Sequence, residues 1–189
     1  MIHIGHGPNI REMLDVLDGF DQPIIITHCF HGHYSSTVLK YSKEEWDEMR
    51  ARGVLFDLGN GDGSYSHDTA LEALARGFEL FTISTDLHNI SKPKKAQNMP
   101  HCMSKVMSAG VELEDVITMS TYNPALAVRL SNTRGVLDVG RGADITILEH
   151  RISDTDSFEF VDYQFDRWRS REGLLPAYVV KDGKLIQCN

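Results

Sequence analysis

The feature that most constrains the fold of this chain is an alternation of strand-like and helix-like segments through about its first 130 residues. Alternation with short connections is typical of parallel strands joined by crossover helices. Four apolar runs have the composition of strands, at residues 2–4, 23–28, 54–58 and 80–85. Helices are expected between and after them. The first is at 9–17, the second is opened by Ser42, and the third ends at about residue 76; three more are expected at 100–109, 113–119 and 123–130. The sequence therefore predicts four consecutive β/α units.

Two of these helices have recognisable start signals. Ser42 is followed three residues later by Glu45, the spacing of a capping box, in which each side chain satisfies a free backbone N–H group. Asn123 is placed to cap the last helix, with Pro124 at the first helical position, where a missing N–H has no cost. Both signals support helices at these places.

From Gly135 onward the pattern changes to β. Residues 143–148 and 178–180 have strand character, and Asp182-Gly183 is a strong signal for a hairpin turn. We therefore expect two parts, an α/β part over residues 1–134 and a small β appendage over 135–189.

Four β/α units are half of the eight that close a (β/α)8 barrel of the TIM type, which typically needs ~250 residues. The chain also begins almost directly on a strand. The expected fold is therefore α/β, the C-terminal half of such a barrel followed by part of a small β appendage. Half a barrel leaves unpaired strand edges and an apolar face, so self-association or a complementing N-terminal half is expected as well.

An acidic composition narrows the range of partners. The 189 residues carry a formal net charge of −8, which disfavours nucleic acid and anionic membranes, because both repel a negative surface. No apolar run is long enough to span a bilayer, and no leader precedes a cleavage site. The three cysteines, Cys29, Cys102 and Cys188, are scattered, so we expect reduced thiols in a cytoplasmic protein.

Polar residues stand at the ends of three of the apolar runs. His3 lies in the first, His28 closes the second and Asp86 follows the fourth. Because the carboxyl ends of parallel strands meet on one rim, these side chains are expected to converge, and imidazole and carboxylate groups are suitable ligands for zinc. Each residue alone also has an ordinary explanation, since a histidine at a strand end is more often structural and an aspartate often caps a loop.

Six segments resemble the amidohydrolase superfamily, and within it the dihydroorotase-like deacetylases. The first three resemble the fifth, sixth and eighth barrel strands of that family, and the others its following helix, the return into its β appendage and its closing hairpin. In order along the chain they are residues 3–5, 26–30, 84–86, 120–125, 135–145 and 180–184. The resemblance covers nearly the whole chain.

The resemblance implies a metal-dependent hydrolase of amide bonds, of the deacetylase or cyclic amidase type, acting on a small molecule. His3 and His28 would bind the more exposed ion of a zinc pair, or of another divalent metal. Asp86 would bind the buried ion and act as the catalytic residue, taking a proton from the attacking hydroxide and passing it to the leaving nitrogen.

The chain departs from the family pattern in its metal ligands. In the family, the first barrel strand supplies a His-x-His pair and the fourth supplies a modified lysine, and neither has a counterpart in this chain. His31-Gly32-His33 has the same letters but stands in a loop, as a chance match or a substrate-loop feature. We therefore expect incomplete coordination, weak zinc binding and no turnover by this chain alone. Three interpretations stay open: a truncated hydrolase, one subunit of a split enzyme, or a non-catalytic binding or scaffold half barrel.

Two further positions are candidates for contact with substrate. Gly61 lies in the glycine-rich run 59–63, which is expected to form an active-site loop with close backbone approach. His88 follows Asp86 and is expected to contact substrate, with a solvated loop histidine as the alternative. Lys92, Lys94 and Lys95 form a polar stretch that we expect to be a solvated loop.

Overall fold

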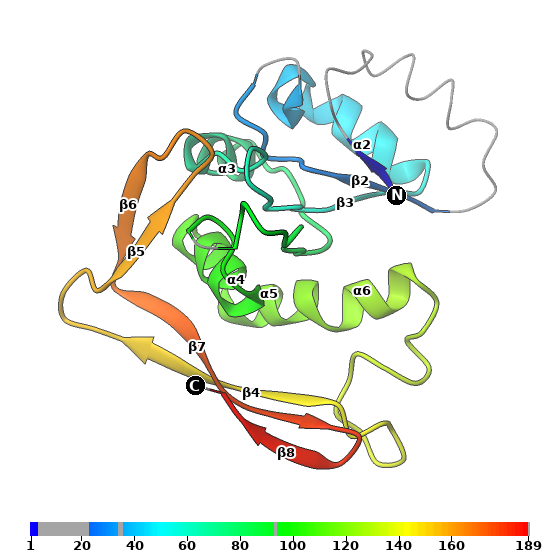
Figure 1. Ribbon diagram of the computed structural model, residues 1–189. Coiled ribbons are helices and arrows are strands. Elements are labelled where there is room, and N and C mark those ends of the chain that lie inside the picture. Colours follow the sequence, from blue (N-terminus) through cyan, green and yellow to red (C-terminus); the bar gives the residue numbers. More distant parts are fainter. Residues whose placement is uncertain (4–22, 34–35, 93, 189) are drawn as a thin grey trace.

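The computed structural model describes residues 1–3, 23–33, 36–92 and 94–188. The helix expected at 9–17 lies outside the described residues. Within them the chain is a mixed α/β protein, and Figure 1 shows three helices lying between a parallel and an antiparallel group of strands.

The parallel sheet contains the first three expected strands. Strands β1 (Ile2–His3), β2 (Ile24–Thr27) and β3 (Val54–Phe56) pair in the order β1-β2-β3, all parallel. Ile26 stands opposite Ile2 on one side and Phe56 on the other. Their carboxyl ends therefore meet at one edge of the sheet, as expected from the sequence.

The fourth expected strand, at 80–85, is not a regular strand. It runs parallel to the chain after β3 but forms only an isolated bridge, between Asp57 and Thr82. Backbone N–H groups of Asn60 and Gly61 donate to the carbonyls of Ser84 and Thr85, each at 3.0 Å. The alignment continues, but the positive φ of Gly59 (51°) and Gly61 (53°) takes the partner segment out of extended geometry.

Two helices follow the strands as expected. Helix α2 (Lys43–Ala51) has the complete capping box of Ser42 and Glu45, and it buries Trp46 and Met49. A 3-10 turn, η2 (Val38–Lys40), precedes it, and α3 (His67–Ala75) is capped by Ser66.

Three helices come next: α4 (Met99–Ser108), α5 (Leu113–Ser120) and α6 (Tyr122–Ala127). The expectation that Asn123 caps the last of them is wrong. Asn123 lies inside α6, and its side-chain amide donates to the carbonyl of Phe81 at 2.8 Å. Tertiary contact with the 80–85 segment therefore determines the position of this side chain, rather than the local helix start.

The C-terminal part is antiparallel. Strands β4 (Ile145–Ile152), β7 (Glu172–Lys181) and β8 (Lys184–Gln187) form a sheet in the order β4-β7-β8. The expected hairpin joins β7 and β8, with positive φ at both Asp182 and Gly183, as a two-residue turn of type I′ requires. A second hairpin, β5 (Phe158–Val161) and β6 (Arg167–Ser170), was not expected from the sequence.

These elements share one core. Phe78 makes ring contacts with Phe30, Trp46 and Phe56, which come from three different segments. On the other side, α4 packs against β7. None of the helices in the described part of the chain is long and apolar enough to cross a membrane. The half barrel and the boundary between residues 134 and 135 stay predictions.

Replacing Met49 with alanine should lower the free energy of unfolding by about 2–5 kcal/mol, because a fully buried side chain is lost and a cavity remains. Urea denaturation followed by circular dichroism measures the change. Leu71→Ala on α3 is the control, since Leu71 is 42% exposed and should cost far less. Equal losses in the two variants would contradict this description of the core.

Candidate active site

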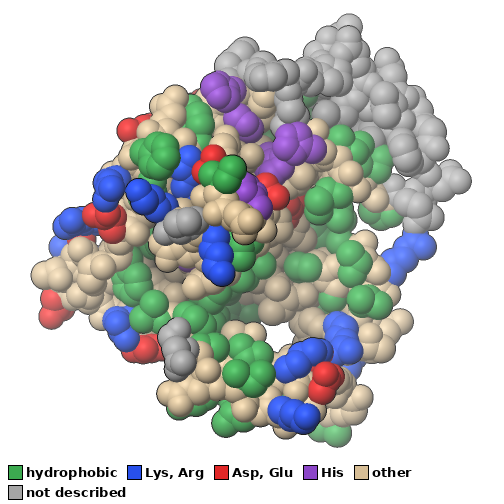
Figure 2. Space-filling view, in the orientation of Figure 1, with side chains coloured by type: hydrophobic (Ala, Val, Ile, Leu, Met, Phe, Trp, Pro, Cys, Tyr) green, Lys and Arg blue, Asp and Glu red, His purple; other side chains and the backbone are tan. Residues whose placement is uncertain are grey.

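Two histidines from neighbouring strands lie in contact at the carboxyl edge of the parallel sheet. His3 ends β1 and His28 directly follows β2. Their ring centroids are 4.2 Å apart, with the rings inclined at 69°. Figure 2 shows histidine side chains gathered on one face of the molecule with acidic side chains among them.

The tautomer of a neutral His28 follows from its hydrogen bond. The side chain is buried, and Nδ1 lies 2.7 Å from the carbonyl oxygen of Gly59. Because a carbonyl oxygen only accepts, Nδ1 must carry a proton, so in the neutral ring Nε2 has the lone pair. Nε2 lies 4.0 Å from Oδ2 of Asp86. A hydrogen bond of this kind is the usual way in which a metal-binding histidine is oriented.

Asp86 lies at the mouth of this group, with half of its side chain exposed. A Cβ placed on Gly61 would stand 2.7 Å from Asp86 Oδ2, so a side chain there would displace the carboxylate, and the positive φ of 53° also favours glycine. His28 and Asp86 both have positive φ, at 68° and 43°. Histidine and aspartate adopt this left-handed region more readily than most other non-glycine residues.

The electrostatics favour a neutral His3. Partial burial and the neighbouring His28 hold the pKa of His3 below its ordinary value, whereas the charge of Asp86 acts in the opposite direction. A neutral imidazole is the form that binds a metal ion.

The imidazole and carboxylate groups of His3, His28 and Asp86 suit a divalent cation, but the distance between two of the donor atoms is too long for one tetrahedral ion. Two ligand atoms at ~2.0–2.1 Å from a tetrahedral zinc ion would be about 3.3 Å apart, closer than the 4.0 Å between His28 Nε2 and Asp86 Oδ2. Among the residues that the structure describes, no group of three or more His, Cys, Asp or Glu side chains is placed to hold a metal ion. The three residues therefore gather without forming a closed site.

Asp57 is a buried residue beside the site that the sequence reasoning missed. It follows β3 and is 1% exposed, and its carboxylate accepts hydrogen bonds from three hydroxyl groups. The donors are Thr27 at 2.6 Å, Thr82 at 2.7 Å and Ser84 at 2.6 Å. Asp57 thus joins β2, β3 and the 80–85 segment just below the site. The strand-end position that singled out His28 and Asp86 could also have found it.

The other expected residues lie nearby or apart. The backbone N–H of His88 donates to Ser91 Oγ at 3.0 Å, and Ser91 Oγ is 3.3 Å from the Asp86 carbonyl, so His88 belongs to the loop that follows Asp86. The rings of His31 and His33 lie beside Tyr163, at 6.2 and 5.6 Å between centroids.

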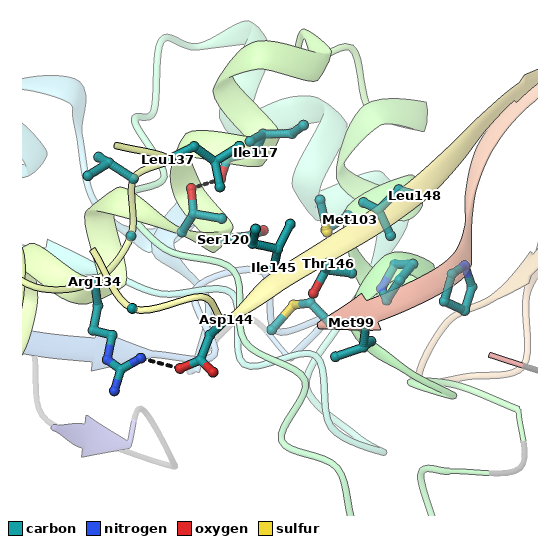
Figure 3. A pocket seen from close by; sticks show the side chains of 17 residues that line it. Met99, Met103, Ile117, Ser120, Arg134, Leu137, Asp144, Ile145, Thr146 and Leu148 are labelled. Carbon is teal, nitrogen blue, oxygen red and sulfur yellow. Dashed lines mark hydrogen bonds and ion pairs between the residues drawn. The ribbon is translucent and has the colours of Figure 1, made fainter. Parts of the chain in front are cut away.

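A cavity of about 730 Å³ lies away from this group, between helices α4 and α5 and strands β4 and β7 (Figure 3). Its lining is largely apolar and includes the side chains of Met103, Ile117, Leu137 and Leu148, which Figure 3 labels. None of the expected site residues lines it. The cavity is therefore separate from the histidine and aspartate site.

Comparison with known proteins identifies the family. The sequence profile of the amidohydrolase family matches residues 9–185. Deacetylases of Agrobacterium fabrum and of Brucella anthropi are each 34% identical over 191 residues, covering 98% of this chain and 45% of each relative. A crystal structure described as a dihydroorotase superposes with a TM-score of 0.82 at 32% identity, covering 99% of this chain and 49% of its own.

The chain therefore belongs to the amidohydrolase family, and the resemblance seen in the sequence is confirmed. It spans about half the length of the curated relatives that it matches.

Replacing Asp57 with asparagine should destabilise the protein by about 2–3 kcal/mol, because at least one hydroxyl donor loses a charged acceptor in a buried place. Thermal or urea unfolding measures the loss. The same change at the exposed Asp154 is the control and should be nearly neutral. An unaltered stability in D57N would show that the carboxylate does not hold these segments together.

Proposed function

We propose that His3, His28 and Asp86 form part of the active site of a metal-dependent amidohydrolase that cleaves an amide bond in a small molecule. The observation that carries the proposal is His28, whose Nδ1–H donates to the carbonyl of Gly59 and whose Nε2 lies 4.0 Å from Oδ2 of Asp86, beside the ring of His3. The family and the names of the relatives support a deacetylase or cyclic amidase reaction.

Each residue has a defined part in the proposal. His3 and His28 would hold a zinc ion or another divalent cation, His28 through Nε2, and Asp86 would bind beside them. When bound, such a cation polarises a carbonyl and lowers the pKa of water. Asp86, half exposed, takes the proton of the attacking water and delivers it to the leaving nitrogen, as a general base and then a general acid.

The neighbouring loop residues complete this part of the site. Gly61 leaves the space that the Asp86 carboxylate occupies, and His88 stands in the same loop as Asp86, where it would contact substrate. The acidic chain is not expected to bind nucleic acid or a membrane. Its three cysteines are free, in keeping with a reducing, cytoplasmic location.

We further propose that these 189 residues are inactive by themselves. Three donors divided between two ions leave most coordination positions empty, and the spacing of His28 and Asp86 is too wide for one tetrahedral ion. The remaining ligands would come from residues beyond this chain, in a longer protein or in a separate subunit.

Titration of the purified chain with zinc should show weak binding and no hydrolysis of N-acetyl or cyclic amide substrates. His28→Ala and Asp86→Asn should each weaken zinc binding at least about 10-fold. Removing a residue that only hydrogen-bonds to a metal ligand already costs about 10- to 100-fold in affinity, and these two residues would be ligands themselves. Isothermal calorimetry measures the affinity.

His150→Ala is the matched control, because His150 lies on β4, paired with Glu172 at 3.1 Å. It should leave the zinc affinity unchanged. Tight binding of two zinc ions by the chain alone would refute incomplete coordination. An absence of zinc binding, or an unaltered affinity in H28A, would refute the site.

A non-catalytic binding or scaffold role is the second candidate function. Whether the chain is catalytic or not, its apolar surfaces favour a partner. The cavity of about 730 Å³ between α4, α5, β4 and β7 is mostly apolar, and exposed side chains such as Ile152, Leu185 and Ile186 lie on the edges of the antiparallel sheet. We propose that a complementing N-terminal half, or a second copy of the chain, covers such surface.

Light scattering of the purified chain should therefore show dimers, larger species or aggregation rather than a monomer. Lowering the exposed apolar area with Leu185→Ser and Ile186→Ser should shift the distribution toward smaller species, because less apolar surface remains to be buried. A stable monomer with one cooperative thermal transition would contradict the need for a partner.

A further inference from the structure

A buried lysine lies behind the proposed site. Lys105 of α4 is 0% exposed, and its ammonium donates to three acceptors. They are the side-chain oxygen of Asn60 at 3.2 Å and the backbone carbonyls of Lys95 at 2.5 Å and Val161 at 2.7 Å. An ammonium group has three protons, so this geometry uses all of them.

The surroundings of Lys105 keep its charge despite the burial. The aromatic rings of Tyr65 and Trp168 lie 5.0 and 5.6 Å from Nζ, within the range of cation–π attraction. Burial lowers the pKa of Lys105 to about 8, against the opposing effects of Cys102 and Asp162. The side chain is therefore still mostly an ammonium at neutral pH, with all three donors present.

The three acceptors belong to segments far apart in the sequence. Asn60 lies in the loop after β3, Lys95 in the segment that follows Asp86, and Val161 at the end of β5. One cation therefore connects the glycine-rich loop, the loop carrying Asp86 and the β5–β6 hairpin.

Asn60 carries this connection to the site. It is 1% exposed, and its amide nitrogen donates to the carbonyls of Gly61 at 3.1 Å and Lys95 at 3.0 Å. Asn60 stands between Gly59, whose carbonyl accepts from His28, and Gly61, whose backbone lies against Asp86. The position of the Asn60 side chain therefore constrains both glycines.

We propose that Lys105 is a positioning residue for the site: through Asn60 it holds the Gly59 carbonyl in place to orient His28 and keeps the Gly61 backbone beside Asp86. This role rests on the proposed function, in which His28 and Asp86 are ligands. It also corrects the sequence-based picture of this region, because Lys95, expected to be a solvated loop residue, is 5% exposed and belongs to the same network.

Lys95 provides a matched comparison. Its ammonium donates to the carbonyl of Tyr163 at 3.0 Å and pairs with Asp62 at 3.1 Å, rather than with Asn60. Lys95→Met therefore removes a buried cation from the same network and leaves the backbone carbonyl that Asn60 and Lys105 use. If Lys105 only stabilised the fold, the Lys105→Met and Lys95→Met variants could differ in stability but would have the same effect on His28.

The test is the tautomer of His28, measured by nitrogen-15 NMR of the imidazoles in the full chain without metal, at a pH where the ring is neutral. The unaltered protein and K95M should show one tautomer, with the proton on Nδ1. K105M should lose this signature and show a mixture, because the Gly59 carbonyl is no longer held against the ring. A single Nδ1–H tautomer in folded K105M, or its equal loss in K95M, would overturn the proposal.

Asn60→Ala gives a second route if K105M does not fold. It keeps the lysine and removes the link to the loop, so the His28 tautomer should again become mixed. A single tautomer in folded N60A would likewise overturn the proposal. Because no metal is added, the result is independent of zinc binding: a chain that binds no zinc but shows these tautomer changes would refute the proposed function and leave the positioning role intact.

Discussion

The geometry of the proposed site depends first on a carboxylate buried between parallel segments. Asp57 accepts hydrogen bonds from Thr27, Thr82 and Ser84, and so aligns β2, β3 and the 80–85 segment. The residues that follow these segments include His28 and Asp86, and both reach the same edge. A charged acceptor with three donors is among the stronger arrangements available in a protein interior.

The loop after β3 places backbone groups against His28 and Asp86 in a way that extended strand geometry would not allow. Gly59 and Gly61 adopt positive φ, which brings a carbonyl against His28 and a bare backbone against Asp86. Lys105, buried and connected to three segments, stands behind that loop. In the proposed site, the orientation of His28 depends on backbone and side-chain groups that would not themselves bind the metal.

Membership of the amidohydrolase family and the open spacing of the donors lead to one functional conclusion. The chain provides two imidazoles and a carboxylate at the edge of a parallel sheet, and spans about half the length of its curated relatives. An apolar cavity lies between α4, α5, β4 and β7, and none of these three side chains lines it (Figure 3). The proposals of weak metal binding and of a covering partner follow from these features together.

The local pattern of the sequence determined the first three parallel strands, the capping box of Ser42 and the Asp182-Gly183 hairpin, because such features depend on residues close together in the chain. It also pointed to the gathering of the candidate site residues, since strand ends meet on one edge. Only the tertiary structure decided that Asn123 reaches Phe81 instead of capping a helix, and that Lys105 is buried beneath the loop. Those outcomes depend on hydrogen-bond acceptors supplied by distant segments, and no local pattern specifies which acceptors a folded chain will bring to a side chain.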